Sequence, residues 1–90
     1  MNKQEFVAFI AEVGNCSKAD ATRALDMITE SITKALGKDK EVSLVGFGSF
    51  YVQRRAAREG RNPKTGAKMH IQAYKQPAFR AGKKLKEACN

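Results

Sequence analysis

The sequence is poor in the residues that crosslink small proteins or bind metals. It contains two cysteines, one histidine, two prolines and no tryptophan among 90 residues. Cys16 and Cys89 are far apart in the sequence, and cytosolic chains rarely keep disulfides, so we expect two reduced thiols. With His70 as the single histidine, no group of residues has the spacing of a zinc site. We therefore expect no metal and no other cofactor.

Long apolar runs are also missing. No run approaches the roughly 20 residues that span a bilayer. The N-terminal segment carries an acid early and has no long apolar core followed by a small-residue cleavage site, so a signal peptide is not expected. We expect a cytoplasmic protein with no membrane partner. Because no nucleophile–base pair, carboxylate pair or metal cluster can be assembled from local motifs, we do not expect an enzyme.

Acidic residues are scarce in the second half of the chain. Residues 1–49 hold six basic and seven acidic residues, whereas residues 50–90 hold eleven basic and two acidic residues. A nearly neutral half joined to a strongly cationic half suggests a scaffold joined to an element that binds a polyanion. Ninety residues suffice for one domain, but a monomer of this size buries too little surface to be more than marginally stable.

Two helices are expected in the first half. Asn2 and Glu5 form a capping-box pattern at the start of the first helix, which Gly14 and the following asparagine should end. Ser17 should cap a long amphipathic helix that ends near Gly37. Two helices joined by a short turn make a helical hairpin. The second helix is nearly neutral, which argues against a recognition helix that enters the major groove.

The hydrophobic period changes to two after residue 40. Val42 and Leu44 share one face, as do Phe50 and Val52, so two short strands should flank a turn at residues 46–48. The Gly-x-Gly in that turn lacks the third glycine and the following helix of a dinucleotide-binding loop. The tail from residue 77 should return to the body and end in a short helix.

Residues 53–76 contain few large apolar side chains and carry a net charge of +6. Asn62 before a proline, together with Gly66, indicates a turn near the middle, and the flanks can pair as one long hairpin. The positive charge of such an arm favours binding to phosphate groups. The minor groove of B-DNA, about 6 Å wide, admits a thin ribbon but no helix. From the residues alone, Pro63 is either a turn residue or an apolar wedge that enters a base step and kinks the duplex.

Four blocks of sequence carry a resemblance to a known family. They are GFGSF (Gly46–Phe50), RAAREGRNPKTG (Arg55–Gly66), Ile71 with Ala73, and PAFxxGKxLK (Pro77–Lys86). Together with the helical hairpin, they resemble the bacterial histone-like family of HU and integration host factor, and the chain looks closest to HU. The match spans essentially the whole chain, and GRNPxTG at this distance after GFGxF is a highly specific signal.

The resemblance implies an α+β fold in an intertwined dimer. The expected elements are an N-terminal helical hairpin, a three-stranded antiparallel sheet with a long protruding β-hairpin arm, and a short C-terminal helix. Residues 1–90 would form a single domain. Residues 1–52 and 77–90 would make the dimerisation body, and residues 53–76 would make the DNA-binding arm.

The resemblance also implies roles for individual residues. Pro63 would be the intercalating residue at the arm tip. The expected DNA contacts are Arg55, Arg58, Arg61, Asn62, Pro63, Lys64, Thr65, Gly66, Lys75, Arg80, Lys83 and Lys86. The expected dimer interface is Leu25, Ile32, Leu36, Leu44, Phe47, Phe50 and Phe79.

The function that the resemblance implies is architectural. Such a protein binds double-stranded DNA in the minor groove with little sequence preference, bends it, and helps compact the nucleoid in the cytoplasm. It would prefer bent, nicked or gapped DNA, as a homodimer or paired with a paralogue. Two alternatives remain open at this point: a site-specific DNA-bending protein of the integration host factor type, and an RNA-binding module of the ribosomal type.

Overall fold

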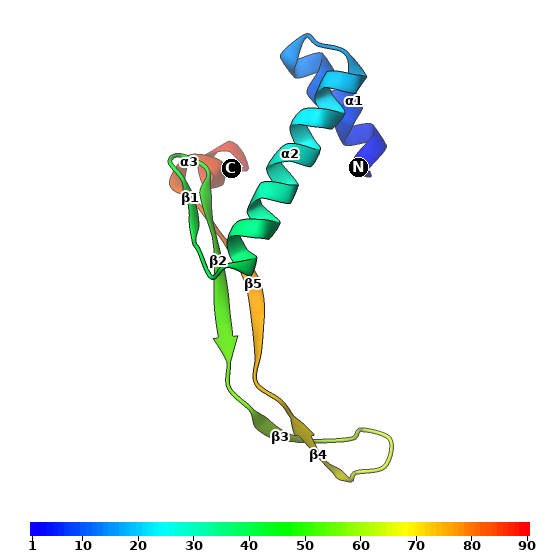
Figure 1. Ribbon diagram of the computed structural model, residues 1–90, viewed down its shortest axis with the longest axis vertical. Coiled ribbons are helices and arrows are strands. Elements are labelled where there is room, and N and C mark those ends of the chain that lie inside the picture. Colours follow the sequence, from blue (N-terminus) through cyan, green and yellow to red (C-terminus); the bar gives the residue numbers. More distant parts are fainter. The chain divides into compact units, whose positions relative to one another are not determined.

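The computed structural model describes all 90 residues, as three helices and five strands (Figure 1). The elements are α1 (Lys3–Gly14), α2 (Lys18–Gly37), β1 (Val42–Leu44), β2 (Gly48–Arg55), β3 (Arg58–Arg61), β4 (Lys68–Ile71), β5 (Tyr74–Ala81) and α3 (Lys83–Ala88). They form two compact units, a helical unit (Met1–Lys34) and a sheet unit (Ala35–Asn90). None of the helices combines the length and hydropathy needed to cross a membrane.

Local capping residues set the ends of the first two helices. The Asn2 side chain accepts a hydrogen bond from the Glu5 N–H at 2.9 Å, and the Ser17 hydroxyl accepts one from the Asp20 N–H at 3.1 Å. Helix α1 ends at Asn15, which adopts left-handed backbone geometry (φ 50°) and donates its N–H back into the last turn. The predicted helical hairpin is confirmed. At Asn2 and Ser17 a side-chain oxygen satisfies an N–H group that the helix leaves free, and at Asn15 the backbone N–H satisfies carbonyl groups of the last turn.

The helical unit has almost no core of its own. Val7 on α1 and Ala21 on α2 are its buried apolar residues, at 8% and 0% exposure. Large apolar side chains on α1 also remain in solvent, with Phe6 at 41% and Phe9 at 49% exposure. The hairpin therefore forms as predicted, but the apolar face of its first helix is not covered within one copy of the chain.

The sheet unit is built on an antiparallel sheet with strand order β1-β2-β5. In its register, Val42 lies opposite Phe50, and Phe50 lies opposite Phe79, so these three side chains share one face. The predicted three-stranded sheet and C-terminal helix are confirmed. The prediction of two short strands around residues 46–48 is wrong for the second strand. Gly48 begins β2, which has eight residues and runs to Arg55.

Phe79 lies directly over the start of β2. A Cβ atom placed on Gly48 would come within 2.6 Å of the Phe79 ring and 2.5 Å of the Arg80 carbonyl oxygen. The same ring also packs against Phe50 and Phe47, at centroid distances of 4.7 and 5.6 Å. Gly48 is required here because the backbone and an aromatic ring occupy the space of any side chain.

The close packing at Gly48 gives a test of the fold. Gly48→Ala should lower the free energy of unfolding by about 2 kcal/mol or more, since an extra methyl group in a filled site forces its neighbours apart. Gly37→Ala is the matched control: a methyl group added there would have no atom within 4 Å, and alanine in a helix gains up to about 1 kcal/mol over glycine. Urea unfolding followed by circular dichroism, at one protein concentration, measures both. Equal midpoints for the two variants would contradict the packing described here.

Candidate nucleic-acid interface

The basic arm consists of two ladders rather than one continuous hairpin (Figure 1). The β2–β5 ladder continues without a break from the body into the arm and ends at the pair Arg55–Tyr74. The β3–β4 ladder then pairs Arg58 with Ile71 through to Arg61 with Lys68. Residues 56–57 and 72–73 lie between the ladders and belong to no strand. The prediction of a single long hairpin is corrected to this extent.

Directly opposed residues share a face of an antiparallel ladder, and successive residues alternate between faces. Arg58 therefore lies on the face of β3–β4 that also carries Ile71, whereas Arg61 shares the opposite face with Lys68 and Glu59. The arginines expected to line one groove thus point to both sides of the ribbon. This arrangement suits a site with negative charge on two walls, because each face presents cations to one wall.

A hollow of about 440 Å³ lies where the two ladders meet. Its lining comes from both sides of the break: Arg55, Ala56, Ala57, Arg58, Tyr74 and Gln76. The two alanines leave room between the arginines. Two of the predicted contact residues, Arg55 and Arg58, are therefore close together at the middle of the arm.

The tip of the arm is a five-residue turn held by local hydrogen bonds. The Gly66 N–H donates to the Asn62 carbonyl oxygen at 2.7 Å, and the Asn62 N–H donates to the Ala67 carbonyl oxygen at 2.8 Å. The Asn62 side chain accepts the Lys64 N–H at 2.8 Å. Gly66 has φ of +71°, a region that glycine enters at little cost. Pro63 occupies the second position, as predicted, where its missing N–H leaves no partner unsatisfied, and its side chain is exposed.

Further cations lie on the body of the sheet unit. The Arg80 guanidinium stands 5.0 Å from the centroid of the Tyr51 ring, on the polar face of the sheet where Ser43 and Ser49 share a hydrogen bond of 3.0 Å. Lys83 and Lys86 are exposed on α3. Tyr51 was missed by the sequence analysis, although strand alternation places it on the face opposite Phe50.

Lys75 has an acidic partner within the chain. Its ammonium lies 2.8 Å from Asp39 Oδ2, and the Arg54 guanidinium lies 3.5 Å from the same oxygen. The hydrogen bond from Lys75 holds the pKa of Asp39 below its usual value, with a smaller contribution from the charge of Arg54. The ion pairs therefore persist above the ordinary pKa of aspartate and are lost as the pH falls through the lowered one. This contact could not be predicted from the sequence, because 36 positions separate the partners.

The sequence of this chain is similar to those of known DNA-binding proteins along its whole length. The sequence profile of the bacterial DNA-binding protein family matches residues 1–90. The chain belongs to this family. It is 56% identical to the DNA-binding protein HU of Rickettsia bellii over 99 aligned positions, covering all of this chain and 98% of the relative. It is 54% identical to HU of Geobacillus stearothermophilus over 88 positions, covering 98% of each chain. The resemblance to HU is therefore confirmed.

Solved HU structures share the fold. A cocrystal structure of Anabaena HU with DNA matches with a TM-score of 0.92 and 47% identity, covering 99% of this chain and 97% of that one. HU from Thermotoga maritima matches with a TM-score of 0.69 and 33% identity, covering all of both chains. The predicted arrangement of helices, sheet and short C-terminal helix is thus the HU fold.

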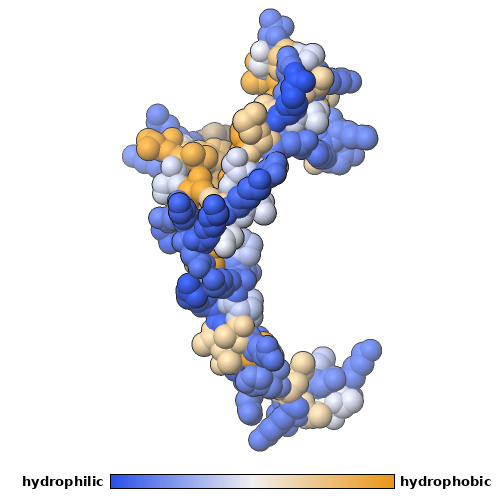
Figure 2. All heavy atoms as spheres, in the orientation of Figure 1, coloured by the Kyte–Doolittle hydropathy of each residue, from blue (hydrophilic) through white to orange (hydrophobic).

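The residues expected at an HU-type dimer interface are incompletely covered in the single chain. Within the sheet unit, Phe47 and Phe50 pack on Phe79, yet Phe47 and Phe79 keep 44% and 41% exposure and Leu44 keeps 44%. The remaining expected residues, Leu25, Ile32 and Leu36, are half-buried on α2. Figure 2 shows hydrophobic atoms gathered at the surface of the molecule around the β1–β2 turn.

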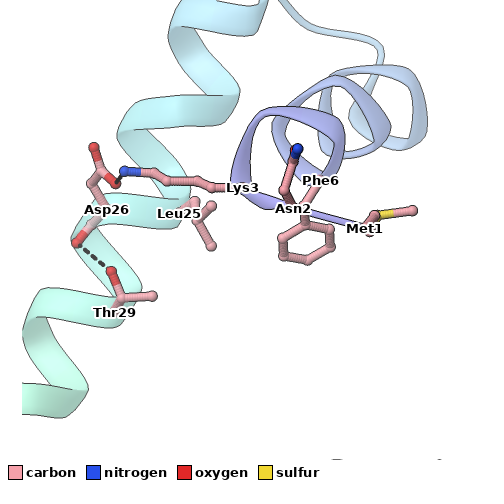
Figure 3. A pocket seen from close by; sticks show the side chains of 7 residues that line it. All are labelled: Met1, Asn2, Lys3, Phe6, Leu25, Asp26 and Thr29. Atoms are coloured by element: carbon pink, nitrogen blue, oxygen red, sulfur yellow. Dashed lines mark hydrogen bonds and ion pairs between the residues drawn. The ribbon is translucent and has the colours of Figure 1, made fainter.

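The helical unit carries an apolar hollow of about 300 Å³ between its two helices (Figure 3). Lys3 of α1 reaches Asp26 of α2 at 2.9 Å along one side. Phe6 and Leu25 line the hollow, and Met1 lies beside them. The hollow therefore shares Phe6 with the uncovered apolar face of α1.

The tip geometry gives a test by hydrogen exchange. Gly66→Ala should raise the exchange rate of the residue 66 amide about 5- to 30-fold, because left-handed geometry costs a residue with a Cβ atom about 1–2 kcal/mol. Gly66→Asn is the control, since asparagine tolerates this geometry far better. Amide exchange measured by NMR on the free protein compares the two. Equal protection in both variants would show that the positive φ does not hold the turn.

Proposed function

We propose that this protein binds double-stranded DNA through its basic arm, enters the minor groove with little sequence preference, bends the duplex and helps compact the nucleoid in the cytoplasm. The observation that carries this proposal is the arm tip. An exposed proline lies at the apex of a cationic ribbon, and four hydrogen bonds fix the turn around it. The similarity to an HU structure that contains DNA, at a TM-score of 0.92, supports the same function.

Phosphate contacts supply the affinity in this mechanism. Arg55, Arg58, Arg61 and Lys64 approach the DNA backbone from the arm, and neutralising phosphates releases condensed counterions. Lys75, Arg80, Lys83 and Lys86 continue this cationic surface toward the body. The backbone contacts carry no sequence information, which accounts for weak sequence preference.

In this mechanism, the tip of the arm bends the DNA duplex. Pro63 inserts between two base pairs and partly unstacks them, at a cost of a few kcal/mol per step, which the extra contacts on bent DNA offset. Asn62, Thr65 and Gly66 hold the proline at the apex. DNA that is already bent, nicked or gapped has part of this deformation in place and binds more tightly.

The proposed active form is a homodimer. One copy buries Val7 and Ala21 but leaves several large apolar side chains more than 40% exposed, and a second copy would cover them. Residues 1–52 and 77–90 would then form the shared body, and residues 53–76 of each chain would form an arm. The relatives named HU favour low sequence specificity over a site-specific role. Selection from random duplexes separates the two, since a strong consensus would contradict the proposal.

Pro63→Ala tests the wedge. Affinity for straight duplex should change by less than about 1 kcal/mol, while the bend angle and the preference for gapped DNA both fall, because the alanine side chain is too small to hold a base step open. Pro77→Ala replaces the other proline, which lies on the edge strand β5, and should leave the bend unchanged. Fluorescence energy transfer between the ends of a labelled duplex measures the angle. An unchanged angle in Pro63→Ala would exclude intercalation by the proline.

Arg58→Ala tests the contribution of phosphate contacts to DNA affinity. It should weaken binding on all sequences and reduce the slope of log K against log salt by up to about one unit. Arg23→Ala removes the same charge from α2, where Arg23 pairs with Asp20, and should leave the slope unchanged. Titrations at several salt concentrations give both slopes. Binding by the unmodified protein that does not respond to salt would overturn the proposed mode of binding.

A further inference from the structure

Asp39 has an unfavourable backbone position in the sheet unit. It follows the last turn of α2 in left-handed geometry, with φ of 59°. The Lys40 N–H donates to the Ala35 carbonyl oxygen and the Asp39 N–H donates to the Leu36 carbonyl oxygen, each at 3.0 Å. This pattern is a Schellman motif, in which glycine is the usual residue at the position of Asp39. An acid is also unfavourable here, since the C-terminal end of a helix carries partial negative charge.

The side chain of Asp39 compensates by binding two cations at the base of the arm. Arg54 of β2 and Lys75 of β5 are direct cross-strand partners, and like charges in such a pair repel one another. Both approach the same oxygen of Asp39, Lys75 at 2.8 Å and Arg54 at 3.5 Å. One carboxylate therefore partly neutralises a pair of cations that would otherwise destabilise the ladder.

These are the arm cations that have an acidic partner. No acid lies within 4 Å of the side-chain nitrogen atoms of Arg55, Arg58, Arg61, Lys64 or Lys68. The side chains of Asp39, Lys75 and Arg54 are 40%, 51% and 70% exposed, so an incoming anion can reach all three. A phosphate would meet two cations that are already paired with a carboxylate, whereas the other arm cations have no acidic partner to displace.

We propose that Asp39 is an intramolecular competitor for DNA phosphate that occupies Lys75 and Arg54 in the free protein. Both cations must leave the carboxylate before they can neutralise the DNA backbone. The cost of this exchange makes DNA binding weaker, and less dependent on salt, than the charge of the arm alone would give. The inference rests on the proposed DNA binding and adds to it a residue that limits affinity.

Asp39 could instead assist DNA binding, and this role predicts the opposite change in affinity when its carboxylate is removed. If the carboxylate orients Lys75 and Arg54 toward DNA, its removal weakens binding. If it competes for them, its removal strengthens binding. The sign of the change therefore decides between the two roles.

Asp39→Asn is the informative variant, because asparagine keeps the size of the side chain and tolerates left-handed geometry while losing the charge. We expect it to bind an intact duplex about 3- to 10-fold more tightly at low salt. The slope of log K against log salt should steepen by about one to two units, at about 0.9 per phosphate neutralised. Fluorescence anisotropy titrations at several salt concentrations measure both, and thermal melting by circular dichroism verifies that the variant is folded.

Asp20→Asn is the matched control. Asp20 is also exposed and also paired with an arginine, but it lies in the first turn of α2 in the helical unit. The variant gains the same net charge and should change affinity by less than about twofold, without a change in slope. An equal gain in both variants would assign the effect to net charge and overturn the role of Asp39.

Lys75→Gln in both backgrounds completes the test. If Asp39 occupies Lys75, this substitution should cost more affinity in the Asp39→Asn protein than in the unmodified one. A folded Asp39→Asn protein that binds no more tightly than the unmodified protein overturns the inference but leaves the proposed function intact. Loss of salt-dependent DNA binding in the unmodified protein itself would instead overturn the proposed function.

Discussion

Almost no apolar side chain of this protein is fully buried within one copy of the chain. Burial of apolar area is the main favourable term in folding, at about 25 cal/mol per Å², and here Val7 and Ala21 are the buried apolar residues. The aromatic cluster of Phe47, Phe50 and Phe79 forms but stays partly open. In the proposed homodimer, a core shared by two copies would resolve this shortage. It would also relieve residues 53–76 of any role in the core, so that this segment can be composed of cations, small residues and turn residues.

Features that depend on near neighbours in the sequence were predictable. The caps at Asn2 and Ser17 and the turn at Asn62–Gly66 each rest on residues within four positions of one another, and each forms as expected. These features are predictable because each depends on a side-chain oxygen, a proline ring or a glycine backbone that shapes the turn in which it lies. The assembly of these helices and strands into one fold was predicted from the family resemblance.

Features that depend on distant partners were not predictable from the residues. The continuation of β2 to Arg55 depends on pairing with β5, and the break at residues 56–57 depends on where that pairing stops. The contact between Asp39 and Lys75 joins a helix end to the last strand, which no periodicity indicates. The distribution of Arg58 and Arg61 on opposite faces follows from register alone, and register is fixed by the whole sheet.

The two like-charged pairs of the arm show how its charge is divided between folding and binding. Near the body, Arg54 faces Lys75, and Asp39 lies against both. Near the tip, Arg61 faces Lys68 with no acid within 4 Å, so no ion pair offsets the repulsion between these two cations. A polyanion beside the tip would reduce this repulsion directly. Beside the body, a polyanion would first have to displace the Asp39 carboxylate from Lys75 and Arg54. If DNA phosphate lies along the arm as proposed, it would therefore relieve more repulsion in the distal ladder, where Arg61 faces Lys68, than in the proximal one, where Asp39 already lies against Lys75.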